Sequence, residues 1–186
     1  MKQIVFDIET TGLNSLSSRI TCICAKVING NEYTGSHTNE KGLIKDFLKF
    51  IAEQRLTYGD FLISANGKDF DLPFLFMRAF LNKIELKDIE WINRLKHFDI
   101  ISDITDKKIS LNNLARIYGF ELKSGNGLNA IKLFEEMRLE ELMNYCMDDV
   151  KLTEKVYLKY NEGVKDDGGF WNSNLSGLSY GADNMR

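Results

Sequence analysis

Residues 60–75, DFLISANGKDFDLPFL, contain a short apolar run, a polar loop and the beginning of a helical pattern. The run at 60–65 is typical of a parallel strand that is buried on both faces. The apolar residues at 72–82 predict a helix, and Pro73 falls in its first turn, where proline is tolerated. A strand followed by a loop and a helix is the repeating unit of an α/β domain.

The segments on either side extend this pattern. Residues 3–8 predict a first strand, and the dipeptide Asn29-Gly30 predicts a hairpin between two further strands at 19–29 and 32–37. Helical spacing of apolar residues predicts helices at 41–55, 110–118, 127–135 and 138–160. A short apolar segment predicts one more strand at 97–101. The sequence therefore predicts an α/β fold with a mixed central β-sheet flanked by helices.

The composition is that of a globular protein with one core. Of 186 residues, 44% are hydrophobic and 27% charged, which excludes a disordered tail, a collagen-like repeat and a disulfide-stapled mini-domain. The formal net charge of -3 argues against a broad basic surface for nucleic acid. It leaves open an enzyme that holds metal ions with carboxylates.

The cysteines and the termini suggest a compartment and a domain boundary. The three cysteines, Cys22, Cys24 and Cys146, form no CxxC pair and have no histidine nearby, so neither a disulfide framework nor a zinc site is expected. We expect a cytoplasmic protein, because the cytoplasm keeps thiols reduced. No apolar run predicts a membrane span or a signal peptide. We expect a domain at 1–162 and a Gly/Asn/Ser-rich tail at 163–186, which is either poorly ordered, packed as a strap, or a docking segment for a protein partner.

Asp7 and Glu9 lie two residues apart in the first predicted strand, so both point to one face of the sheet. Two carboxylates side by side in an otherwise apolar strand repel each other and are costly to desolvate unless a cation lies between them. They predict either a divalent metal site or a strand end at which both acids reach solvent.

Asp71 follows the buried strand at 60–65, at the edge of the sheet where α/β active sites form. It could also cap the helix that starts near residue 72. Capping would explain neither Asn66 nor Phe70, and Gly67-Lys68 does not have the spacing of a phosphate-binding loop.

Tyr145 and Asp149 lie four residues apart in the longest predicted helix and share one of its faces. Alone, such a pair is more often a surface acid beside a half-buried tyrosine. Asp148 points about 100° away around the helix and is expected to be solvated.

Together, the segments FDIETTGL (6–13), NGKDFDLPFL (66–75) and YCMDDVKLT (145–153) resemble the three motifs of the DEDD 3′–5′ exonuclease superfamily, which has a ribonuclease H-like fold. The resemblance is closest to the proofreading domain of family-B DNA polymerases and its stand-alone relatives, and it covers roughly residues 2–160. HFDIISD (97–103) and SLNNLARIYGFELKSG (110–125) also fit the connecting region of those relatives. Tyr145 identifies the tyrosine subtype, because the histidine subtype has its histidine where this chain has Asn144.

The resemblance implies a 3′–5′ exonuclease that uses two Mg²⁺ or Mn²⁺ ions on single-stranded DNA and releases nucleoside 5′-monophosphates. It implies that Asp7 bridges both ions, that Glu9 and Asp149 complete the coordination shell of the first ion, and that Asp71 holds the second ion. Tyr145 would orient the attacking water, since a phenol with an ordinary pKa is a poor base at neutral pH. The residues implied to contact the nucleic acid are Thr10, Thr11, Gly12, Leu13, Asn66 and Phe70, although core packing is favoured for Phe70.

Two alternatives remain at this stage: a 3′–5′ exoribonuclease, and a catalytically silent module that binds nucleic acid or a protein. Setting the four metal-binding acids aside leaves 23 of the 27 acidic residues against 24 basic ones. The chain is therefore expected to grip a few 3′-terminal nucleotides through metal ions and not along a basic track.

Overall fold

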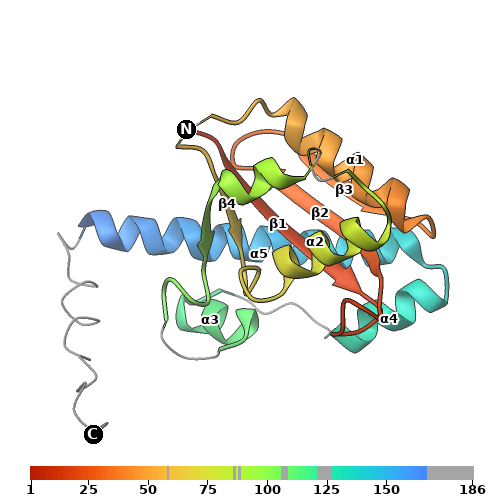
Figure 1. Cartoon of the computed structure of the whole chain (residues 1–186). Helices are drawn as coiled ribbons and strands as arrows, with labels where there is room; N and C mark the ends of the chain where they lie inside the picture. Colours follow the sequence, from red (N-terminus) through yellow and green to blue (C-terminus); the bar gives the residue numbers. More distant parts are fainter. Residues whose placement is uncertain (58, 86, 88, 106–108, 121–126, 167–186) are drawn as a thin grey trace, which may run out of the picture.

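The computed structural model describes residues 1–57, 59–85, 87, 89–105, 109–120 and 127–166. Its centre is a five-stranded sheet with the strand order β3-β2-β1-β4-β5 (Figure 1). The strands are β1 (Gln3–Thr10), β2 (Ile20–Val27), β3 (Glu32–Ser36), β4 (Phe61–Ser64) and β5 (Lys96–Asp99). The pairs β1–β2 and β2–β3 are antiparallel, whereas β1–β4 and β4–β5 are parallel. The prediction of a mixed sheet is confirmed.

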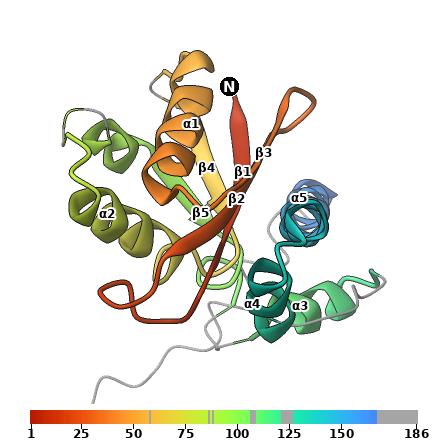
Figure 2. The same ribbon diagram turned by 90° about the vertical axis from the view of Figure 1, so that its right-hand side faces the viewer.

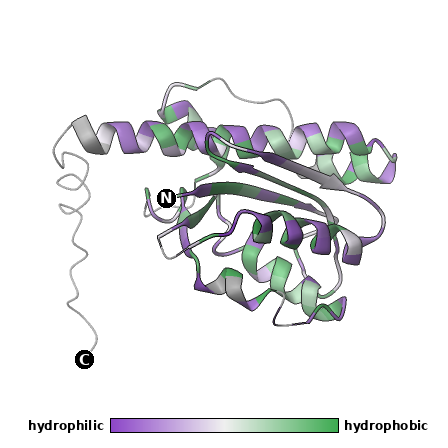
Figure 3. Ribbon diagram, turned by 90° about the horizontal axis from the view of Figure 1, so that it is seen from above, coloured by the Kyte–Doolittle hydropathy of each residue, from purple (hydrophilic) through white to green (hydrophobic). Residues whose placement is uncertain are grey.

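The helices cover both faces of this sheet. They are α1 (Glu40–Glu53), α2 (Asp71–Leu81), α3 (Leu111–Ile117), α4 (Gly127–Glu135) and α5 (Leu139–Asp166), with a short 3₁₀ helix, η2 (Glu90–Arg94). Figure 2 shows α1 and α2 on one side of the sheet and α3, α4 and α5 on the other. In Figure 3, hydrophobic residues colour the central strands, and hydrophilic and hydrophobic residues alternate along α5.

The alternation of side chains along β1 divides the core into two layers. Ile4, Phe6 and Ile8 pack in the layer that contains α1 and α2. Val5 packs in the other layer, which contains α5. Asp7 and Glu9 follow the register of Val5, so the strand directs both acids towards α5.

The strands and helices predicted from the sequence are all present, with shifted ends. Asn29 has φ 60°, the left-handed conformation that a tight hairpin requires. α5 extends to Asp166, past the domain boundary expected at 162. The 3₁₀ helix η2 was not predicted, and Phe170, Trp171 and Tyr180 of the tail lie outside the described residues. Among the helices described, none has the length and apolar character needed to cross a membrane.

Candidate active site

Asp7 and Glu9 form the floor of the site on β1. A carboxylate oxygen of each and the sulfur of Cys146 on α5 lie within 4.8 Å of one another. Glu9 is 9% exposed and Asp7 is half-buried. The structure thus favours the interpretation of a shared site over that of two acids that separately reach solvent.

Asp71 joins this site from the first turn of α2. The pairing of β1 with β4 ends at Val5–Ile63, and further along β1 the backbone N–H of Ile8 donates to Oδ1 of Asp71 at 3.0 Å. Phe70, and not Asp71, occupies the N-cap position of α2. The capping alternative for Asp71 is therefore wrong, and its side chain is fixed against β1 between Asp7 and Glu9.

The environment of Asp71 opposes its ionisation. The side chain is almost fully buried, and this burial raises its pKa to about 7, with a further contribution from the negative charges of Asp99 and Asp149. The negative charge of Asp149 on α5 therefore acts on Asp71 at the start of α2. Carboxylates held together in this way favour a bound cation, which would offset their repulsion.

Tyr145 and Asp149 line the site one helical turn apart on α5, and both are half-buried. Burial raises the pKa of Tyr145 well above its usual value, and the negative charges of Asp149, Glu9 and Asp7 raise it further. The phenol therefore keeps its proton at neutral pH. Asp148 is exposed, as predicted.

Asp99 at the end of β5 is a part of the site region to which the sequence analysis gave no role. Its buried carboxylate accepts hydrogen bonds from the backbone N–H groups of Asn66 (2.8 Å), Lys68 (2.9 Å) and Ile101 (2.9 Å). Asp99 therefore shapes the loop that leads to Asp71. The available signal was an acid within the apolar strand predicted at 97–101, which the structure ends at Asp99.

The loop after β1 carries the other residues predicted to meet the nucleotide. The Thr10 hydroxyl donates to the Gly12 carbonyl at 2.8 Å, and the Thr11 hydroxyl accepts from the Arg19 N–H at 3.0 Å. A Cβ at Gly12 would lie 2.7 Å from Oγ of Ser18, so a larger residue there would require the Ser18 hydroxyl to move. Leu13 is 86% exposed at the tip and free to contact a ligand.

A buried ion pair braces this loop. Nε and Nη2 of Arg78 on α2 donate to the two carboxylate oxygens of Glu40 at 2.8 and 2.7 Å, and Nη1 donates to the Ser15 carbonyl at 3.1 Å. Glu40 also accepts from the Ile20 N–H at 2.7 Å. Burial alone would raise the pKa of Glu40, but the hydrogen bonds from Arg78, Asn82 and Ile20 hold it below its usual value. No local pattern in the sequence predicted this pair.

Asn66 and Phe70 differ in their surroundings. Asn66 is exposed, has φ 69°, and borders a cavity of about 500 Å³ lined by Ala65, Asn66, Asp69, Ile101, Ile109, Ser110 and Leu111. Phe70 is half-buried and packs on Phe74, with ring centroids 5.3 Å apart. These contacts fit the packing role favoured for Phe70.

The residues present fit divalent cations of the hard, oxygen-binding kind. Carboxylates from β1, α2 and α5 converge, and burial of Asp71, with a smaller contribution from the charges of Asp99 and Asp149, raises its pKa. Carboxylate oxygens are the ligands that Mg²⁺ and Mn²⁺ prefer.

Comparison with known proteins agrees with this fold. The family model of the RNase H superfamily matches residues 4–161, and the chain belongs to this superfamily. It therefore has a ribonuclease H-like fold. Comparison with curated proteins found no match.

Among solved structures, the chain is similar to the family B DNA polymerase from the hyperthermophilic archaeon Pyrobaculum calidifontis. The two share 20% sequence identity with a TM-score of 0.71, and the match covers 88% of this chain. The chain spans only 24% of the polymerase, so the likeness concerns one part of that protein. The predicted resemblance is thus confirmed in fold and in superfamily.

Proposed function

We propose that the protein is a metal-dependent 3′–5′ exonuclease that removes nucleoside 5′-monophosphates from the 3′ end of single-stranded DNA. The observation that carries the proposal is the convergence of Asp7 and Glu9 on β1, Asp71 on α2, and Tyr145 and Asp149 on α5. A silent binding module would have no chemical need for four acids and a phenol in one place.

Asp7, Glu9, Asp71 and Asp149 would hold two divalent ions, Mg²⁺ or Mn²⁺. When bound, such a pair activates a water molecule and stabilises the charge that develops on the phosphate and the leaving oxygen. The Asp71–Ile8 hydrogen bond fixes one ligand directly to β1, so the spacing of the acids is set by the sheet and not by a loop.

Tyr145 acts as a hydrogen-bonding group that orients the attacking water. Its raised pKa leaves the phenol protonated at neutral pH, which makes it a poor general base and a stable donor. Its oxygen can accept a hydrogen bond from water while its proton is donated elsewhere.

Thr10, Thr11, Gly12 and Leu13 bind the terminal nucleotide in this proposal. The braced loop presents Leu13 to solvent, where it can pack against a base or sugar. The cavity beside Asn66 has room for part of the next nucleotide, with polar and apolar groups on its walls. DNA is favoured over RNA because of the family-B resemblance and the family B DNA polymerase among the structural neighbours.

The test is a nuclease assay on matched single-stranded DNA and RNA oligonucleotides labelled at the 5′ end, with Mg²⁺, Mn²⁺ or EDTA. We expect metal-dependent, stepwise shortening of the DNA from its 3′ end and release of nucleoside 5′-monophosphates. Faster shortening of RNA would support the exoribonuclease instead. Binding without shortening in any metal would support the silent module and contradict the proposal.

A further inference from the structure

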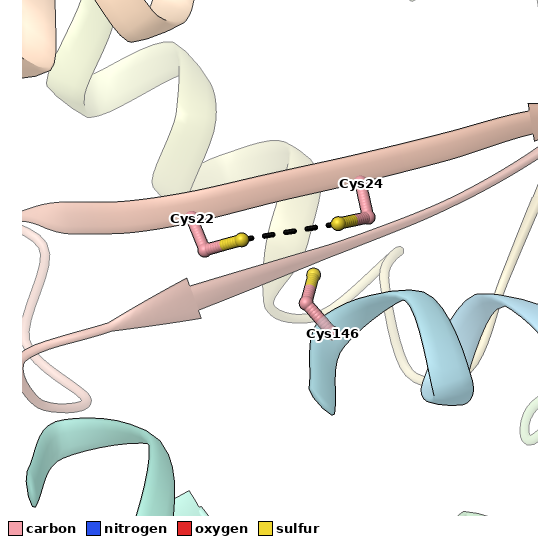
Figure 4. Close-up of side chains that lie close together, drawn as sticks. All are labelled: Cys22, Cys24 and Cys146. Carbon is pink, nitrogen blue, oxygen red and sulfur yellow. Dashed lines mark hydrogen bonds between the residues drawn. The ribbon is translucent and has the colours of Figure 1, made fainter. Parts of the chain in front are cut away.

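Three cysteines from two elements meet beneath the acidic site. Cys22 and Cys24 lie on β2 and Cys146 on α5, and their sulfur atoms are all within 4.8 Å of one another (Figure 4). Each of the three residues is 0% exposed, and each is a free thiol. We call these residues the thiol cluster.

The sheet register places the thiol cluster beside the carboxylates. In the antiparallel β1–β2 pair, Cys24 is opposite Asp7 and Cys22 is opposite Glu9. Directly opposed residues project to the same face, so both thiols point towards α5 as both acids do. Cys146 completes the cluster from α5, and its sulfur lies 3.5 Å from the Asp7 carbonyl oxygen and 3.6 Å from Asp7 Oδ2.

The spacing of the sulfurs suits a single metal ion. Two thiolates on one tetrahedral zinc ion lie about 3.8 Å apart, because each Zn–S bond is about 2.3 Å long. The separation of the Cys22 and Cys24 sulfurs is 3.8 Å. Cys146, within 4.8 Å of both, needs to move by no more than about 1 Å to reach the same ion.

The backbone disfavours the competing disulfide between Cys22 and Cys24. Residues two apart in an extended strand have Cα atoms about 6.6–6.8 Å apart, at the outer limit for a disulfide. Pairing with β1 on one side and β3 on the other holds this part of β2 extended. The two thiols therefore remain available as separate ligands.

We propose that the thiol cluster is a second metal site, one that takes a soft, thiophilic divalent ion such as Zn²⁺ or Cd²⁺. Thiolate sulfur selects such ions, whereas the neighbouring carboxylates select hard ones. Binding exchanges three S–H protons for one divalent ion and releases the protons to solvent. The resulting cluster has a net charge of −1, which hard cations on the adjacent acids would balance.

Cys146 links the two sites because it is close to both groups of ligands. As a thiol it can donate to Asp7, and as a metal-bound thiolate it cannot. This proposal departs from the expectation of no zinc site at Cys22, Cys24 and Cys146, which rested on their lack of CxxC spacing; the three come together only through the β2–α5 contact.

The experiment titrates the reduced, metal-free full-length protein with Co²⁺, a spectroscopic substitute for zinc. We expect one ion per chain to produce a thiolate-to-cobalt charge-transfer band, which Zn²⁺ then removes by displacement. Calorimetry of Zn²⁺ binding in buffers of different ionisation enthalpy should show proton release from the thiols. Carboxylate-bound cobalt gives no such band, so the signal belongs to the thiol cluster alone.

Cys22→Ala and Cys24→Ala should each abolish the band, and Asp149→Asn, which removes a carboxylate outside the cluster, should retain it. Circular dichroism and thermal unfolding verify that each variant is folded. If the wild-type protein gives no band, or if the cysteine variants keep it, the cysteines only pack as small apolar groups and the proposal is wrong. Neither result depends on nuclease activity, so the proposed function is tested separately.

Discussion

Two adjacent acids of α5 differ in their surroundings, so one of them can serve as the control for the other. Asp149 is half-buried and faces Tyr145 and the other carboxylates, whereas Asp148 is exposed. We expect Asp149→Asn to lower kcat by about 10³-fold or more, since several kcal/mol of charge stabilisation are lost at about 1.4 kcal/mol per factor of ten. Asp148→Asn should retain wild-type kcat. Single-turnover assays with Mg²⁺ measure both, and equal activity of the two variants would remove Asp149 from the site.

Asp71 should make the metal-free fold sensitive to pH. Burial raises the pKa of Asp71 from its ordinary 3.8 to about 7 in the folded protein, so between these values the folded state binds more protons than the unfolded chain. Stability from this group is therefore complete below about pH 4 and lost as pH rises through 7. Asp71→Asn, whose amide oxygen can still accept from Ile8, should remove this loss.

The measurement is the free energy of unfolding in EDTA, compared between the wild type and Asp71→Asn from pH 4 to pH 8. The advantage of the variant should grow with pH and reach a few kcal/mol. The comparison also cancels the opposite effect of His97, whose pKa burial lowers to about 4 in both proteins. An advantage that is constant with pH would show that Asp71 has an ordinary pKa.

The sequence predicts which residues belong to a motif, but it does not predict the residues that hold them in place by hydrogen bonds. The sequence placed Asp71 after a strand, but left ligand and cap as alternatives. Its hydrogen bond from the backbone N–H of Ile8 depends on how α2 packs against β1, which only the folded structure reveals. Asp99 was missed for the same reason, because two of its three backbone donors, Asn66 and Lys68, belong to a loop whose path no local pattern defines.

At the scale of elements, the Arg78–Glu40 pair joins α1, α2 and the loop after β1. Arg78→Met would leave a buried carboxylate without its cation, and we expect a loss of about 3 kcal/mol in the free energy of unfolding. The loop that carries Leu13 also loses the contact to the Ser15 carbonyl. The KM for single-stranded DNA should therefore rise more than kcat falls.

A matched control lies on α1. Lys49 and Glu53 are 3.9 Å apart and mostly exposed, so Lys49→Met should change stability by no more than about 0.5 kcal/mol. Denaturant unfolding and steady-state kinetics compare the two variants. Equal stabilities would show that the buried pair does not brace the loop.

The elements themselves were predictable because periodicity is local. Apolar spacing located each strand and α-helix, but the ends shifted where tertiary contacts decide, as at Thr10, where β1 extends to the loop. The Glu40 side chain is the clearest omission. An acid in the first turn of a helix is ordinarily solvated, and only the fold brings Arg78 to it.

At the scale of the whole molecule, the net charge of -3 and a nucleic-acid substrate are compatible if binding is local. For single strands, the logarithm of affinity falls with the logarithm of salt concentration by about 0.7 per phosphate contacted. With about two or three phosphates held near the 3′ end, we expect a slope of roughly −1 to −2. Fluorescence anisotropy of a labelled oligonucleotide with Asp149→Asn, at fixed Mg²⁺ and increasing KCl, measures it. A slope steeper than about −4 would require some six contacts, and thus a basic track along the strand.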